Sequence, residues 1–73
     1  MNLSDVINRG FDKFCGGHCD SIAILDVEGE TLQVVPLDKT DMIAPEYMQS
    51  KFLAIGSSTI KPSRVRVRID YLN

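Results

Sequence analysis

The 73-residue sequence has few of the residues and motifs on which enzymes depend, with no tryptophan and a single histidine, His18. No glycine-rich loop precedes Lys-Ser or Lys-Thr, and no serine or cysteine nucleophile has an identifiable base and orienting acid. A chain of this length also has little room to enclose a substrate. We therefore expect a protein without catalytic residues, enzymatic activity or cofactor.

Long apolar runs are also missing. No segment approaches the roughly 18 to 20 apolar residues that cross a bilayer, and the segment MNLSDVINRG has neither the basic start nor the apolar centre of a signal peptide. Two cysteines are too few for a disulfide scaffold, so we expect reduced thiols. These absences predict a cytoplasmic protein without membrane contact, and its length predicts one domain, residues 1–73, with a small core.

The segment FCGGHCD gathers potential metal ligands: Cys15, His18, Cys19 and Asp20. Structural zinc sites usually take two separated ligand pairs, and the chain offers no second pair. Thiols at the end of a helix also lack activation by its dipole. We interpret the segment as a glycine-rich helix exit and predict no metal site, with a zinc ion in a dimer and redox chemistry as the alternatives.

Apolar spacing predicts a helix in LSDVINRGFDKFCGG, with Ser4 as its N-cap and Gly16-Gly17 as its end. The segment 20–38 has two β-branched runs around Glu28-Gly29 and predicts a hairpin. Its first strand is apolar on both faces and should be central, while Pro36 should end pairing in the second.

The segment 39–58 is ambiguous. Pro45 suits the first turn of a helix that places Met48, Phe52 and Ile55 on one face and ends at Gly56, which is the interpretation we prefer. The rival interpretation makes KFLAI a strand, because a short apolar run is buried equally well in either form.

The strongest pattern is SRVRVRIDYL, in which valine, isoleucine and tyrosine alternate with polar residues at the period of a strand. The predicted order is therefore helix, strand, strand, helix, strand. We expect a small α+β fold, in which an antiparallel sheet of about three strands packs on one or two helices.

Charge is divided unevenly along the chain. Residues 1–46 carry nine acidic and three basic side chains, whereas residues 47–73 carry five basic ones and a single acid, Asp70. Arg64, Arg66 and Arg68 would lie about 6 to 7 Å apart on one strand face. Three interpretations remain: neutralisation by Asp26, Glu28 or Glu30 within the fold, an acidic protein partner, or nucleic acid.

The overall acidity of the chain and the apolar setting of its aromatic residues make nucleic acid the weaker of the two binding interpretations. We predict a small non-catalytic regulator or accessory factor that binds another protein with an acidic surface. The predicted binding residues are Arg64, Arg66, Arg68, Lys61 and Lys51. The alternatives are a nucleic-acid-binding module and a self-associating structural subunit, the latter forming a homodimer if the C-terminal strand lies at a sheet edge.

Overall fold

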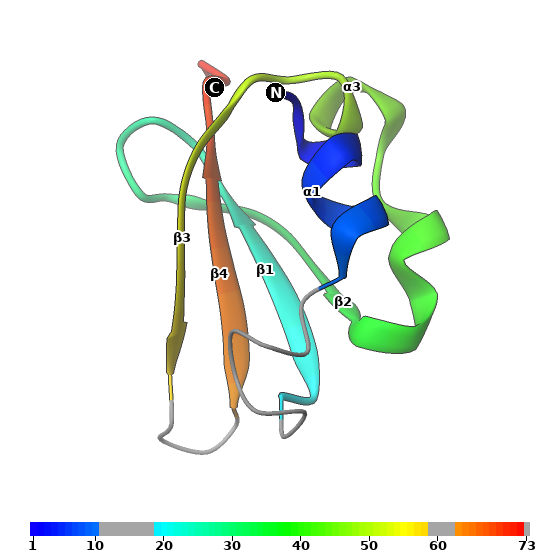
Figure 1. Ribbon diagram of the computed structural model, residues 1–73. Helices are drawn as coiled ribbons and strands as arrows, with labels where there is room; N and C mark the ends of the chain where they lie inside the picture. Colours follow the sequence, from blue (N-terminus) through cyan, green and yellow to red (C-terminus); the bar gives the residue numbers. More distant parts are fainter. Residues whose placement is uncertain (11–18, 59–62, 73) are drawn as a thin grey trace.

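The computed structural model describes residues 1–10, 19–58 and 63–72, which build a four-stranded mixed sheet with short helices (Figure 1). The strand order is β2-β1-β4-β3, with β1 parallel to β4 and both outer pairs antiparallel. In chain order the elements are α1 (Leu3–Arg9), β1 (Ser21–Leu25), β2 (Thr31–Pro36), the 3-10 helix η1 (Leu37–Met42), α3 (Pro45–Met48), β3 (Phe52–Ser58) and β4 (Arg64–Ile69).

The sheet corrects the predicted architecture in three respects. It has four strands rather than about three, its central pair is parallel, and the C-terminal strand β4 lies inside the sheet between β1 and β3. Because β4 pairs on both sides, the edge position on which we based homodimer formation through this strand is absent. The predicted mixture of helices and strands in one small body agrees with the structure.

The hairpin prediction is confirmed. Ser21–Leu25 and Thr31–Pro36 pair in antiparallel register, β2 ends at Pro36, and Gly29 takes the positive φ of 85° that the turn requires. The prediction that β1 is central is also confirmed, since Ile22, Ala23 and Ile24 are all buried.

The first helix is capped by a different residue from the one predicted. Asn2, not Ser4, accepts from the backbone N–H of Asp5 at 3.0 Å, and the Asp5 carboxylate accepts from the backbone N–H of Asn2 at 3.0 Å. This reciprocal capping box satisfies two N–H groups at once, which the Ser4 assignment did not consider. Helix α1 ends at Arg9 with Gly10 as its C-cap, and residues 11–17 of the predicted helix lie outside the described residues.

The preferred helix over residues 45–55 is wrong beyond Met48. Only Pro45–Met48 is helical, and Phe52–Ser58 forms β3, as the rival interpretation held. The local pattern suits both forms. Pairing with β4 favours the strand, because the backbone groups of residues 52–58 gain partners along one whole side.

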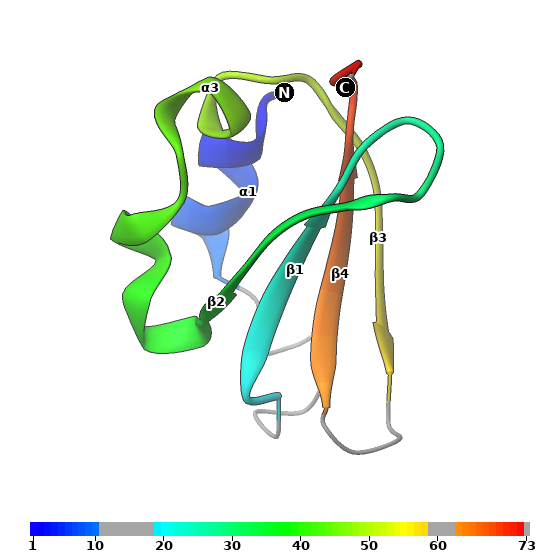
Figure 2. The same cartoon turned by 180° about the vertical axis from the view of Figure 1, so that it is seen from behind.

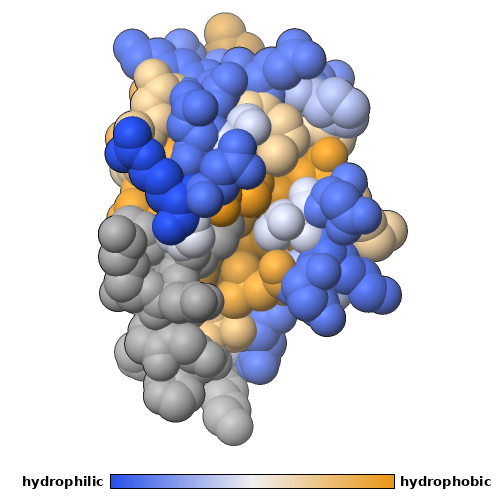
Figure 3. All heavy atoms as spheres, turned by 45° about the vertical axis from the view of Figure 1, so that its right-hand side comes forward, coloured by the Kyte–Doolittle hydropathy of each residue, from blue (hydrophilic) through white to orange (hydrophobic). Residues whose placement is uncertain are grey.

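The apolar core lies between the sheet and the helices, which occupy one side of the sheet in Figure 1 and in Figure 2, its view from behind. Figure 3 shows the helix-bearing side, where strips of apolar surface lie between polar patches. No helix in the described part of the chain is long and apolar enough to cross a membrane. The buried core residues are Leu3, Val6, Ile22, Ile24, Val35, Ile43, Val65, Val67 and Ile69.

Candidate binding face

Strand β4 divides its side chains between the two sides of the sheet. Val65, Val67 and Ile69 are fully buried against the helices, whereas Arg66 and Arg68 are exposed on the opposite side. Arg64 is half-buried. The alternation predicted for this strand is therefore confirmed, and we refer to the side that carries the three arginines as the arginine face.

The neighbours of these arginines are small or apolar. Directly opposite Arg66 lie Ala23 on β1 and Gly56 on β3. Residues paired directly across strands point to the same side of a sheet, so these positions share the arginine face. Since neither neighbour carries a polar side chain, the sheet itself offers Arg66 no cross-strand partner.

Arg68 has the same kind of surroundings. Its paired residues are Leu25 on β1 and Ala54 on β3, and neither of them has a side chain that can accept a hydrogen bond. The two exposed guanidinium groups of β4 therefore rise from a surface made by aliphatic side chains and a glycine.

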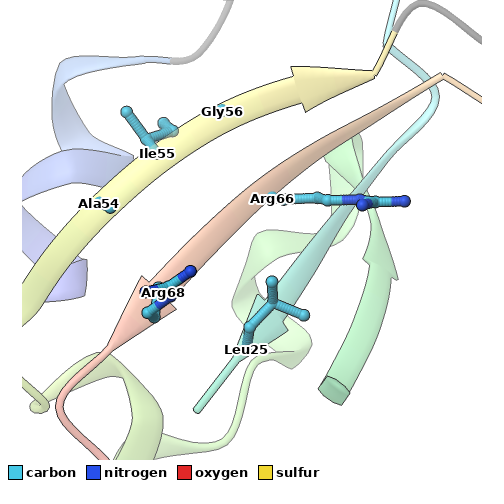
Figure 4. Close-up of a pocket in the computed structure, with 6 residues that line it drawn as sticks. All are labelled: Leu25, Ala54, Ile55, Gly56, Arg66 and Arg68. Atoms are coloured by element: carbon cyan, nitrogen blue, oxygen red, sulfur yellow. The ribbon is translucent and has the colours of Figure 1, made fainter. Parts of the chain in front are cut away.

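A shallow depression of about 310 Å³ lies on this surface between β1, β4 and β3. Figure 4 shows Arg66 extending from β4 across β1, away from β3. This direction agrees with the 3% exposure of Ala23, since an arginine stem covers apolar surface while its charged end stays in water. The depression is lined by Leu25, Ala54, Gly56, Arg66 and Arg68, and by Ile55, whose side chain points away from the two arginines in Figure 4.

Asp26, proposed as a neutralising partner, has a structural role instead. Its side chain is 3% exposed, and its Oδ1 accepts from the backbone N–H groups of Glu28 at 2.8 Å and Glu30 at 3.0 Å. The carboxylate thus holds the turn that joins β1 to β2, and it fits the rule that a buried charge must be hydrogen-bonded.

Glu28 and Glu30 are exposed, and neither they nor any other carboxylate in residues 1–10, 19–58 and 63–72 forms an ion pair with Arg66 or Arg68. The interpretation in which the fold neutralises its own arginines is therefore wrong for these two residues. The physical reason is the mixed sheet, because β4 pairs with the apolar strand β1 and the uncharged strand β3 rather than with an acidic one.

Arg64 differs from its two neighbours. It pairs with Ser21 and Ser58, and its Nε atom is buried without a hydrogen-bond partner among the described residues. A buried donor without a partner costs about 1 to 3 kcal/mol. Arg64 is the first residue of β4, so this unfavourable term is located at the end of the strand. Arg64 does not line the depression.

The two predicted lysines are not brought into this site. Lys51 is exposed before β3, where its carbonyl accepts from the N–H of Asp70 at 2.8 Å, and it does not line the depression. Lys61 lies outside the described residues. The depression is thus formed by two of the five predicted binding residues, together with residues of β1 and β3 that the prediction did not include.

Among the described residues, no group of three or more histidine, cysteine, aspartate or glutamate side chains could hold a metal ion. The prediction for Cys15 and His18 lies outside the described residues. Cys19 is disulfide-bonded, which corrects the expectation of a reduced thiol at this position.

Sequence reasoning missed Ala54 and Gly56 because it preferred a helix over this segment. The available signal was a pair of short runs of comparable length, KFLAIGSS and RVRVRI, which pair when both are extended. The chain matches no protein-family model, and comparison with curated proteins and with solved structures found no significant match.

Proposed function

We propose that this chain is a non-catalytic binding protein that recognises an acidic surface of another protein through the arginine face. The observation that carries the proposal is the exposure of Arg66 and Arg68 without a carboxylate partner among the described residues. A guanidinium group accommodates a carboxylate with two parallel hydrogen bonds, which gives both strength and orientation.

The surroundings of the arginines support a protein partner over nucleic acid. Binding of single-stranded nucleic acid usually relies on exposed aromatic rings on which bases stack. The described aromatic side chains, Tyr47, Phe52 and Tyr71, are instead half-buried against the apolar core. Aliphatic surface beside two arginines suits a protein interface, in which arginine is enriched and apolar contacts exclude water.

Affinity capture from a native lysate, with and without nuclease, tests the proposal. Arg66→Glu should abolish the capture of a protein partner, because the new carboxylate would repel the carboxylates of the partner's acidic surface. Arg9→Glu is the matched control, since Arg9 is exposed at the end of α1 on the helix-bearing side and the change in net charge is identical.

A partner that resists nuclease, is lost with Arg66→Glu and is retained with Arg9→Glu supports the proposal. Recovery of nucleic acid alone, with affinity that falls steeply and linearly with the logarithm of salt concentration, would overturn it in favour of a nucleic-acid-binding module. Equal loss with both variants would also contradict it, because the effect would then reflect net charge and not the arginine face.

A further inference from the structure

The two edges of the sheet differ in how they are protected. On β2, the Gln33 side chain donates to the carbonyl of Met42 at 2.9 Å and accepts from the N–H of Ala44 at 3.0 Å, so the segment after η1 is tied to this strand. Pro36 also ends the strand, and proline cannot extend a hydrogen-bonded ladder. These features discourage pairing of β2 with another chain.

The other edge, β3, has such protection only at its start. The N–H of Phe52 donates to the carbonyl of Met1 at 3.0 Å, and the strand is irregular between Phe52 and Ala54. From residue 54 to residue 58, the described residues supply no further strand beyond β3, and the sequence AIGSS contains neither charge nor proline. This part of the edge is open to another strand.

The open part of the edge adjoins the arginines. Ala54 lies opposite Arg68 and Gly56 lies opposite Arg66. Apart from Gly56 and its two chain neighbours, no described residue has a heavy atom within 4 Å of the place where a Cβ on Gly56 would stand. A strand added beside β3 would lie roughly 10 Å from β4, a distance that extended arginine and glutamate side chains span together when only small residues intervene.

We propose that β3 binds an extended acidic segment of the partner by strand addition, an inference that rests on the function proposed for the arginine face. Carboxylates on one side of the added strand reach over Ala54 to Arg68, and they reach Arg66 over Gly56 when the Arg66 side chain turns from β1, over which it lies in Figure 4, toward β3. The intervening residues point to the other side of the sheet, where half-buried Ile55 makes apolar side chains the suitable neighbours. The partner segment therefore alternates acidic and apolar residues.

A second copy of this chain fits the edge less well than an acidic strand does. Pairing two β3 edges would satisfy their backbone groups, but Phe52–Ser58 contains no carboxylate to bring to the arginines. Charge complementarity therefore selects the acidic partner. We expect the isolated protein to have the mass of one chain in light scattering, and a stable dimer that excludes the peptide described next would overturn the proposal.

Strand addition is tested with a blocked peptide of alternating glutamate and valine and two N-methylated versions of it. In one version the backbone nitrogen of every glutamate is methylated, and in the other the backbone nitrogen of every valine is methylated. In a strand, alternate residues direct their backbone groups to the same edge, so only one set can face β3. We expect the unmodified peptide to bind, and one methylated version to lose affinity by at least about ten-fold while the other retains it.

The same titration separates failure of strand addition from failure of the proposed function. If both methylated peptides bind as the parent does, and R66Q/R68Q abolishes binding of all three, strand addition is overturned and recognition by the arginine face stands. If the unmodified peptide does not bind, strand addition is again overturned, and the capture experiment decides the proposed function by itself. Slower amide exchange at residues 54–58 with the parent peptide supports strand addition directly.

Discussion

The two sides of β4 show how one strand serves two purposes. Toward the helices, Val65, Val67 and Ile69 are fully buried, and burial of each such side chain contributes about 1.5 to 3 kcal/mol. Toward solvent, Arg66 and Arg68 have no ion-pair partner among the described residues and add little to folding. The difference teaches that stability and the proposed recognition reside in alternate residues of the same strand and can be altered separately.

The largest expected effect follows from truncating the buried side. Ile69→Ala should lower the free energy of unfolding by about 2 to 5 kcal/mol, because it removes buried methyl groups and leaves a cavity in a small core. Arg68→Ala, at the adjacent position on the arginine face, should change it by less than about 0.5 kcal/mol. Urea unfolding of both variants measures the contrast, and equal losses would contradict the division between the two sides.

Asp26 tests whether the acidic residues serve the turn rather than the arginines. Asp26→Ala should cost about 1 to 3 kcal/mol, because the N–H groups of Glu28 and Glu30 lose their acceptor. Asp26→Asn should cost less, since both hydrogen bonds are made to Oδ1 and an amide retains that oxygen. Thermal unfolding of the two variants gives the comparison, and a loss in Asp26→Asn as large as in Asp26→Ala would mean that the charge itself matters.

Gly56→Glu should raise stability while weakening partner binding. Its carboxylate would stand opposite Arg66 in open space, so it would supply within the chain the charge expected of the partner. Replacing a strand glycine and adding a cross-strand ion pair should together contribute about 0.5 to 1.5 kcal/mol.

Gly56→Gln is the matched control for this substitution, since it has the same shape without the charge. It should share the backbone effect but retain more binding to the glutamate–valine peptide. Urea unfolding and peptide titration of both variants measure the two quantities, and improved peptide binding by Gly56→Glu would contradict the role given to Arg66.

The smallest expected effect is on the pH dependence of stability, and it involves Tyr71, which follows β4 on the buried side of the sheet. Tyr71 contacts Tyr47 of α3 edge-to-face, with ring centroids 5.0 Å apart. Burial raises the pKa of Tyr47 above its ordinary value, as do Tyr71 and Glu46. Above pH 10 the unfolded chain loses this proton before the folded chain does, so stability contributed by Tyr47 is present below pH 10 and is lost as pH rises.

Tyr47→Phe should therefore flatten the decline of stability in alkali, with little change at neutral pH. Urea unfolding across the alkaline range measures this difference. An unchanged slope above pH 10 would show that Tyr47 does not contribute to the decline.

Sequence reasoning succeeded where the pattern was local. The alternation in β4, the turn at Gly29 and the end of β2 at Pro36 each depend on a few neighbouring residues, and all three were predicted. It failed for β3, because a short apolar run is compatible with a helix or a strand until a partner strand is known. The wrong assignment removed Ala54 and Gly56 from the predicted site.

By itself, the sequence determined that β4 alternates basic and apolar residues and that its arginines lie on one side, since this depends only on the period of an extended chain. Only the tertiary structure decided what flanks them. Pairing is a long-range interaction, and the pairing of β4 with β1 and β3 sets uncharged residues, not carboxylates, opposite Arg66 and Arg68. The same pairing places β3 at the edge, where small residues leave both arginines open to a partner.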